Sequence, residues 1–201
     1  MTSKTFYTDA LADDAYERGT GEFKSDDNKT YVYSNTDAEN YSYICAGIRF
    51  PNITIGAGAT ISTAYFRITA TYMSENNANF TLFGNAANNA LNFVDSATII
   101  ARDRTTANAS FVYNSLGMDW FGADQEIKTI IQEIIDRPGW AASNAICLLL
   151  IGNTDSNKKV RFASDHGGVH ADGPELHIEY TGGTDPVTTY RQIMTTQSNF
   201  W

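Results

Sequence analysis

Positive charge is scarce in this sequence, and its scarcity limits the partners that the chain can have. Lys and Arg together number 14 against 23 Asp and Glu, which gives a formal net charge of −9 at pH 7. The basic residues form no run. Because nucleic acids and anionic membranes are bound through clustered Lys and Arg, we expect neither as a partner. Charged residues of both signs amount to only 18%, so Asn, Thr, Ser and Tyr must cover much of the surface.

Long apolar runs are also missing. No stretch has the roughly 20 apolar residues that a membrane-spanning helix needs. The opening residues, MTSKTFYTDALADDAYE, lack the apolar core of a secretory signal peptide. We therefore expect synthesis in a cytoplasm, with no signal peptide and no transmembrane segment.

Cysteine occurs only twice. Cys45 lies in YSYICAGIRF and Cys147 lies in NAICLLLIG, and both runs are apolar and strand-like. We interpret the two residues as small buried hydrophobic side chains. A disulfide would require their Cβ atoms to face each other, and the sequence leaves that pairing open.

What the sequence does contain is a series of short segments with a period of two. In ISTAYFRITATYMS, Phe66, Ile68 and Ala70 share one face, while Tyr65 and Arg67 lie on the other. The segment ELHIEY alternates in the same way, and AICLLLIG is apolar throughout, which predicts a strand buried on both faces. Turns rich in Gly, Asn and Asp separate the segments. The pattern predicts an all-β fold, an antiparallel two-sheet β-sandwich of the jelly-roll type.

One segment predicts a helix instead. EIKTIIQEIIDRPGW spaces its Ile residues at i, i+3, i+4, i+7 and i+8, which is the apolar stripe of an amphipathic helix. Asp124 can cap the start, and Pro138 forces an end because proline lacks the amide donor. We expect this helix near residues 125–136. Structural roles are assigned to Ile127, Ile130, Ile131, Ile134, Pro138 and Trp140.

The composition changes near the C-terminus, which divides the chain into a domain and a tail. We expect a β-sandwich domain over residues 1–181 and a tail over residues 182–201 that has no room for a core of its own. Two interpretations of the tail remain open. It can fold back over its own domain, or it can cross to a neighbouring subunit or another partner, and we expect the second. The interface residues would be Tyr190, Ile193, Met194, Phe200 and Trp201.

Several strings together carry a resemblance to a known family. They are DDAYERG, RFPNITIGAGATISTAYFRITA, IIQEIIDRPGW and VRFASDHGGVHADGPELHIEY. Over about residues 13–180 the chain resembles the disaggregatase-related, DNRLRE-type β-sandwich modules. Such modules occur in bacterial surface proteins, beside polysaccharide-active enzymes and in phage virion proteins. The resemblance implies that the helix is a crossover laid against the open end of the core, with Trp140 filling the gap before the next buried strand.

Candidate catalytic and zinc-binding residues gather in one segment. Ser164, Asp165 and His166 are the residue types of a hydrolase triad, but residues adjacent in a strand or turn point in different directions and cannot relay a proton. His166 and His170 lie four apart with Asp172 nearby, which a loop could wrap around zinc. We interpret them as ordinary surface histidines in the glycine-rich loop HGGVHADG. No enzymatic activity is expected.

Acidic residues near predicted turns offer oxygens to a hard cation. Asp13 and Asp14 with Glu17, or Asp26 with Asp27, could ligate a structural calcium ion, although no ordered ligand spacing is present. We interpret them as solvated turn residues and expect no cofactor, with calcium as the alternative.

Aromatic residues supply the remaining functional signal. Tyrosines exceed what a core requires, and aromatic rings serve either at protein–protein interfaces and in cores or as stacking surfaces for sugars. We expect the first role. His177, in the last predicted strand, is expected to face solvent beside a cross-strand partner. The tyrosines concerned are Tyr7, Tyr16, Tyr31, Tyr33, Tyr41, Tyr43, Tyr72 and Tyr113.

Two functional hypotheses follow. The first is a phage virion structural protein made in the host cytoplasm, namely a capsid decoration or cement protein, a head fibre or a tail component. Its partners would be other virion proteins and copies of itself, for example in a trimer. The alternative is a carbohydrate-binding module of a surface or polysaccharide-active system, with a glycan as its partner. From the sequence, we expect the virion role.

Overall fold

A computed structural model describes most of the chain. It covers residues 1–18, 23–24, 29–36, 42–73, 78–93, 99–113, 117–121, 127–152, 158–163 and 173–183. Within these residues, twelve strands are hydrogen-bonded into one antiparallel ladder, with a single α-helix and one 3-10 turn, η1. The elements are β1 (Thr2–Tyr7), η1 (Leu11–Asp13), β2 (Asp14–Arg18), β3 (Phe23–Lys24), β4 (Lys29–Thr36), β5 (Ser42–Phe50), β6 (Ala59–Met73), β7 (Ala78–Asn85), β8 (Arg104–Tyr113), β9 (Gly117–Phe121), α1 (Lys128–Ile135), β10 (Ile146–Gly152), β11 (Lys158–Ala163) and β12 (Glu175–Gly182).

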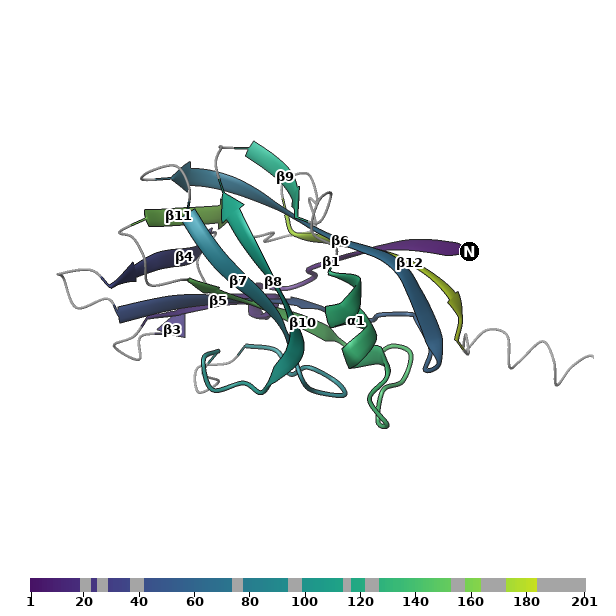
Figure 1. Cartoon of the computed structure of the whole chain (residues 1–201). Helices are drawn as coiled ribbons and strands as arrows, with labels where there is room; N and C mark the ends of the chain where they lie inside the picture. Colours follow the sequence, from purple (N-terminus) through teal and green to yellow (C-terminus); the bar gives the residue numbers. More distant parts are fainter. Residues whose placement is uncertain are drawn as a thin grey trace, which may run out of the picture.

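The ladder folds over on itself to make a sandwich. Its order is β1-β12-β6-β11-β4-β5-β10-β7-β8, with β2 beside β5, β3 beside β2, and β9 beside β6 (Figure 1). Aromatic pairs cross the interior, because Phe50 of β5 meets Phe66 of β6 at 6.1 Å and Phe80 of β7 meets Phe162 of β11 at 6.2 Å between ring centroids. The strands β1, β12, β6 and β11 therefore face β5, β10, β7 and β8, and β4 joins the two layers. The predicted antiparallel sandwich with a single helix is confirmed.

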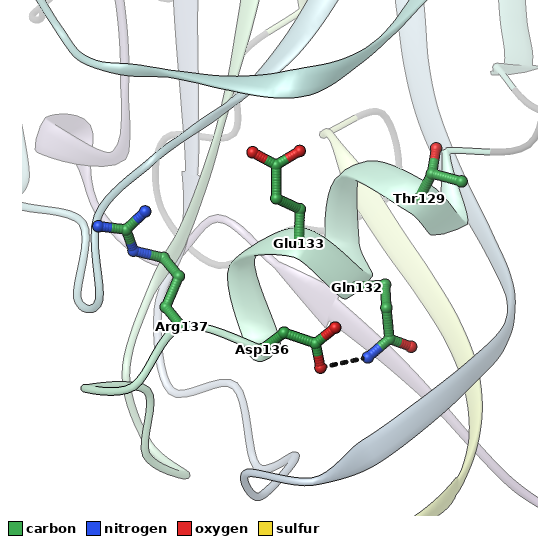
Figure 2. Close-up of a pocket in the computed structure, with 5 residues that line it drawn as sticks. All are labelled: Thr129, Gln132, Glu133, Asp136 and Arg137. Atoms are coloured by element: carbon green, nitrogen blue, oxygen red, sulfur yellow. Dashed lines mark hydrogen bonds between the residues drawn. The ribbon is translucent and has the colours of Figure 1, made fainter.

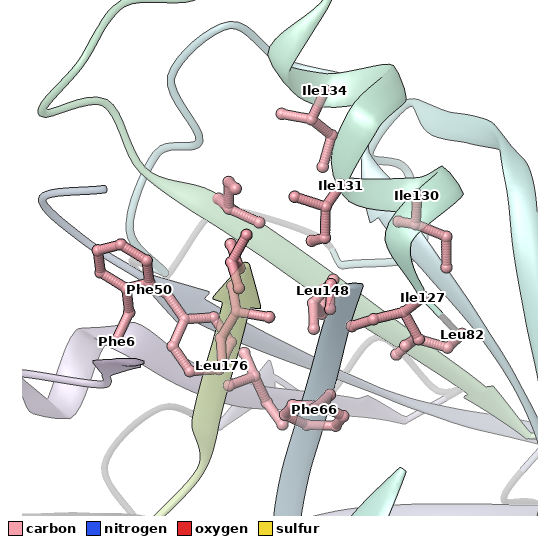
Figure 3. Close-up of a cluster of buried hydrophobic side chains, with 14 of the residues drawn as sticks. Phe6, Phe50, Phe66, Leu82, Ile127, Ile130, Ile131, Ile134, Leu148 and Leu176 are labelled. Atoms are coloured by element: carbon pink, nitrogen blue, oxygen red, sulfur yellow. The ribbon is translucent and has the colours of Figure 1, made fainter. Parts of the chain in front are cut away.

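The core between the layers is built from the buried faces of alternating strands. In β6, Ala64, Phe66, Ile68 and Ala70 point inward and are at most 3% exposed. Figure 3 shows the isoleucines of α1 directed into the same cluster as side chains from β5, β6, β10 and β12. Burial of apolar surface, at about 25 cal/mol per Å², supplies the main driving force for this arrangement. The fully buried members with the largest side chains include Phe50, Phe66, Phe80, Phe162, Ile48, Ile68 and Leu82.

A second, smaller core covers the outer side of β10. Cys147 and Leu149 of β10 belong to it, whereas Leu148 belongs to the main core. Phe93 lies on this outer side against Gly47 of β5, where a Cβ atom would come within 2.3 Å of its ring. The predicted strand with both faces buried is therefore confirmed, and the part of the loop from 86 to 103 that the structure describes is what covers its outer face.

The helix α1 is shorter than the predicted range of 125–136. It begins at Lys128, with Ile127 at the N-cap position, and ends at Ile135 with Asp136 as its C-cap. Asp124 lies outside the described residues, as do the first two residues of the predicted range. Pro138 is exposed in the turn that follows the helix. The apolar stripe is fully buried. Its members are at most 1% exposed, namely Ile127, Ile130, Ile131, Ile134 and Ile135.

Two polar side chains of α1 bind the edges of two different strands. The side-chain amide of Gln132 accepts a hydrogen bond from the Ile61 amide of β6 at 2.8 Å and donates to the Ala59 carbonyl at 3.0 Å. The carboxylate of Glu133 accepts hydrogen bonds from the Thr106 and Ala107 amides of β8, both at 2.8 Å. These strands belong to opposite layers. The helix therefore closes the side of the sandwich that lies opposite β4.

Glycine and tryptophan fix how α1 and the following turn sit on the sheet. A Cβ atom on Gly84 of β7 would lie 2.7 Å from Ile134 and 2.9 Å from Ile130, so only glycine lets the helix approach this closely. Trp140 is 4% exposed and donates from its indole nitrogen to the Ile55 carbonyl at 2.9 Å. The ring thus fills the corner between the helix and the loop before β6.

Within the described residues, no helix is both long enough and apolar enough to cross a membrane.

We expect Glu133→Ala to destabilise the fold by about 1–3 kcal/mol, because it leaves two strand amides without their charged acceptor. Gln132→Ala should cost about 1 kcal/mol for the loss of its two bonds to β6. Urea unfolding measures both, with Thr129→Ala, an exposed position on the same helix, as the matched control. If both variants are as stable as the control, the side chains do not close the sandwich.

Candidate functional site

Many residues that the sequence singles out lie outside the described part of the chain. What the sequence predicts for these residues therefore stays a prediction. The triad and zinc candidates there are Ser164, Asp165, His166, His170 and Asp172. The acidic pair is Asp26 and Asp27, and the tail residues are Tyr190, Ile193, Met194, Phe200 and Trp201.

The acidic residues Asp13 of η1 and Glu17 of β2 hold loops in place. Asp13, whose side chain is 3% exposed, pairs with Arg49 and accepts hydrogen bonds from the amides of Asp9 and Ala10, each at 3.1 Å. Glu17 accepts a hydrogen bond from the Ile100 amide at 3.0 Å. These carboxylates are engaged by protein donors. In the residues that the structure describes, no group of three or more His, Cys, Asp or Glu side chains is placed to hold a metal ion.

The two cysteines are buried and unpaired. The register between β5 and β10 sets Cys147 opposite Arg49 and Cys45 opposite Ile151, so the two thiols lie at opposite ends of the strand pair. Burial raises the pKa of each thiol from 9.0 to about 12, with a further contribution from Glu17 at Cys45. A thiol that stays protonated is a poor nucleophile, so both residues act as small apolar side chains.

The tyrosines that the sequence suggests as interface, core or sugar-stacking residues differ in how exposed they are. Tyr16 is a core residue with 3% exposure, Tyr7 is half-buried, and Tyr72 is 44% exposed. The others lie where the structure describes no side chain, namely Tyr31, Tyr33, Tyr41, Tyr43 and Tyr113.

A shallow depression of about 540 Å³ lies on the outer side of α1, lined by Thr129, Gln132, Glu133, Asp136 and Arg137 (Figure 2). Four of the five side chains that line it are already engaged. Gln132 and Glu133 bind the strand edges, the Gln132 amide also donates to Asp136 at 2.7 Å, and Arg137 donates to Asn88 at 3.1 Å. A ligand would have to displace bonds that close the sandwich. We therefore do not assign the functional site to this depression.

A more suitable surface is the side of β1, β12 and β6 that faces away from the core, which we call the outer face. The strand registers align three rows of three residues across it, and each row joins directly opposite positions. Every member carries a hydroxyl, carboxylate, imidazole or guanidinium group, and none is aliphatic. The rows are Ser3, Glu179 and Thr63; Thr5, His177 and Tyr65; and Tyr7, Glu175 and Arg67.

The middle row of the outer face is organised around His177. Its ring stacks on that of Tyr65, with 6.1 Å between centroids and 20° between planes. Its Nδ1 lies 3.1 Å from the Thr5 hydroxyl and its Nε2 lies 3.3 Å from the Ser3 hydroxyl. The expectation that His177 faces outward beside cross-strand partners is confirmed. The contacts hold both rings in fixed positions above the sheet.

The next row contributes an ion pair. Arg67 and Glu175 are directly opposite each other and form a salt bridge, with side-chain exposures of 20% and 9%. The pair fixes the orientation of both polar groups beside the Tyr65–His177 stack. A planar guanidinium with several donors and a carboxylate with several acceptor positions thus lie next to aromatic rings.

The outer face does not have the geometry of a hydrolase. Ser3, His177 and Glu179 are the residue types of a triad, but Glu179 approaches the same nitrogen, Nε2, that Ser3 contacts, at 3.9 Å. In a triad the acid holds the opposite nitrogen of the ring. Here that nitrogen faces Thr5, which cannot stabilise an imidazolium as a carboxylate does.

Comparison with known proteins does not identify a family. No family model matches the chain, and no curated protein matches it. Among solved structures, one similar chain is described as a non-crystalline cellulose specific carbohydrate-binding module, CBM28. The alignment has 9% identity and a TM-score of 0.31, and covers 83% of this chain and 79% of that one. This likeness assigns no function to the protein.

Sequence reasoning found some members of the outer face and missed their combination. Alternation placed Tyr65, Arg67 and His177 outward, but Tyr65 was not among the tyrosines singled out. The strands that meet here are far apart in the sequence, so the register that aligns Thr5, His177 and Tyr65 could not be derived from local pattern. One signal of the site was available in the sequence. The outward positions of two separate strands include side chains with rings, not only Lys or Glu.

The cysteines generate a prediction about pH. The unfolded chain loses its thiol protons near pH 9, whereas the folded chain keeps them to about pH 12. The thiols therefore contribute constant stability below pH 9 and a falling contribution between pH 9 and 12. We expect the free energy of unfolding to fall more steeply over that range than in a Cys45→Ala, Cys147→Ala variant. If the free energy of unfolding falls equally with pH in the native chain and in the variant, the thiols are not buried as described.

Proposed function

We propose that the protein is a non-catalytic carbohydrate-binding module whose outer face binds a neutral polysaccharide. The observation that carries this proposal is the outer face itself, three aligned rows of hydroxyl, carboxylate, guanidinium and aromatic side chains around the Tyr65–His177 stack. Sugars present hydroxyl groups that both donate and accept hydrogen bonds, together with apolar C–H surfaces that pack on aromatic rings. The outer face offers partners for both.

The charge of the outer face favours a neutral ligand. It carries Arg67 against Glu175 and Glu179, and the whole chain has a net charge of −9. An acidic glycan would meet like charge with one guanidinium to offset it, and that guanidinium is already paired with Glu175. A neutral chain meets no such repulsion.

The shape of the outer face favours a chain over a chain end. Three neighbouring strands make a surface about 10 Å across, and the rows extend roughly 13 Å along the strands. The depression of about 540 Å³ lies elsewhere, on α1. Ser3 and Thr5 of the outer face are exposed, and its other members are half-buried or, for Glu175, buried. Such a surface suits a stretch of extended polysaccharide, whereas recognition of a terminal sugar normally uses a pocket.

Binding is tested by affinity gel electrophoresis against neutral polysaccharides such as hydroxyethylcellulose, xyloglucan and glucomannan, with alginate as an acidic polymer. We expect retardation by at least one neutral polymer and about a tenfold or greater loss of affinity in Tyr65→Ala and His177→Ala, equivalent to about 1.4 kcal/mol. The matched control is Tyr72→Ala, an exposed tyrosine on the same strand outside the three rows.

Two outcomes would contradict the proposal. One is that no neutral polysaccharide retards the protein. The other is that Tyr65→Ala binds as well as Tyr72→Ala, which would place any glycan site away from the outer face.

The virion role expected from the sequence, and localisation in a virion, stay predictions. Part of their support is the tail, and residues 184–201 lie outside the described part of the chain. Stoichiometric presence in purified particles remains the measurement that decides them.

A further inference from the structure

The two terminal strands of the ladder differ in how their edges are covered. The ladder ends at β8 on one side, where the Glu133 carboxylate binds the amides of Thr106 and Ala107. It ends at β1 on the other, and within the described residues β12 is the one strand paired with β1 (Figure 1). Alternate residues of an antiparallel edge strand direct their N–H and C=O groups away from their partner. Such an edge is a template for a further strand.

The charged side chain of β1, that of Lys4, makes its contacts within the domain and not at the open edge. Lysine on an edge strand commonly opposes the addition of another chain. The Lys4 ammonium instead donates to the carbonyl and the hydroxyl of Thr54, at 3.1 Å and 2.8 Å, and lies 5.8 Å from the centre of the Tyr180 ring. A strand added beside β1 would therefore bury no unpaired charge of β1 itself. The exposed side chains of β1, those of Thr2, Ser3 and Thr5, are uncharged.

The sequence just beyond β12 has the composition of a strand. Residues 187–197, VTTYRQIMTTQ, are rich in Thr, Ile, Val and Tyr and carry a single charge, that of Arg191. They follow Gly182 and Gly183, whose φ angles of 70° and 82° turn the chain out of the direction of β12. The exit point adjoins β1, because Thr2 is paired with Tyr180.

The direction of the chain after β12 determines whether a strand of the same copy or of a second copy would pair with β1. β12 runs towards the Thr2 end of β1, so the residues that follow it start from that end. Laid on β1 of the same chain, they would run parallel to it, although every described pair in this ladder is antiparallel. A second copy can approach in the opposite orientation and give the antiparallel pairing that is the more stable of the two.

We propose that β1 of one copy accepts residues 187–197 of a second copy as an additional antiparallel strand. A reciprocal exchange makes the interface self-complementary and closes a two-fold dimer. The proposal concerns the edge of β1, not the outer face, and does not depend on glycan binding.

The test uses the full chain with Gln192→Pro and Ile193→Pro in separate variants. Successive strand residues direct their amides to opposite sides, so one of the two prolines removes an N–H that would bond to β1. Gln192→Ala is the matched control because it keeps that amide. We expect sedimentation equilibrium to give a dimer for the native chain and the control, and a weaker association by at least tenfold in one proline variant.

Hydrogen exchange then identifies the acceptor strand. In the dimer, amides of β1 that point away from β12 should be protected, and they should exchange faster in the proline variant that dissociates. A monomer at every concentration measured would overturn the proposal. So would a dimer that both prolines leave intact, or a dimer whose dissociation leaves the exchange of β1 unchanged.

Discussion

The hydrogen bonds that Gln132 and Glu133 make to two opposite strand edges are the constraint on which the architecture depends. Successive helix residues are about 100° apart, so these two side chains flank the two margins of the isoleucine stripe. The stripe enters the core, Gln132 binds β6 on one margin, and Glu133 binds β8 on the other. One short helix thus closes a sandwich whose other side is closed by β4. The Gly84 contact with Ile130 and Ile134 makes this closeness possible.

The same closure holds the outer face in position. The inward residues of β6 and β12, among them Phe66 and Ile178, pack in the core that α1 completes. Their outward neighbours, Tyr65 and His177, therefore stand on strands that cannot shift without unpacking that core. A rigid sheet with cross-strand contacts between its side chains presents a preorganised surface, which lowers the entropy lost when a ligand binds.

Local pattern in the sequence was enough to predict some of the elements, though not β1 or β9, and none of their partners. The isoleucine stripe predicted α1, and the apolar run around Leu148 predicted a strand with two buried faces, because both signals reside in single segments. The helix start at Lys128 was not predicted, since it has no side-chain cap. The roles of Gln132 and Glu133 could not be predicted either, because their acceptors and donors lie on strands far away in the chain.

The site was less predictable than the fold for a related reason. Of the tyrosines that the sequence emphasised, Tyr16 is a buried residue of β2, opposite Ala46 of β5. Tyr65 gains its significance only from the register that brings β12 beside β6 and places His177 opposite it. An outward aromatic ring is visible in a sequence, whereas a pair of rings on two strands is visible only in the fold.

Amide hydrogen exchange at the two strand edges tests the closure most directly. Thr106 is exposed and Ala107 is half-buried on a terminal strand, where amides would ordinarily exchange rapidly. If Glu133 closes the sandwich, both amides and that of Ile61 exchange as slowly as the paired amides of β8, and they lose protection together when Glu133 and Gln132 are replaced by Ala. The account is contradicted if the Thr106 and Ala107 amides of the native protein exchange as fast as unpaired amides at an open strand edge.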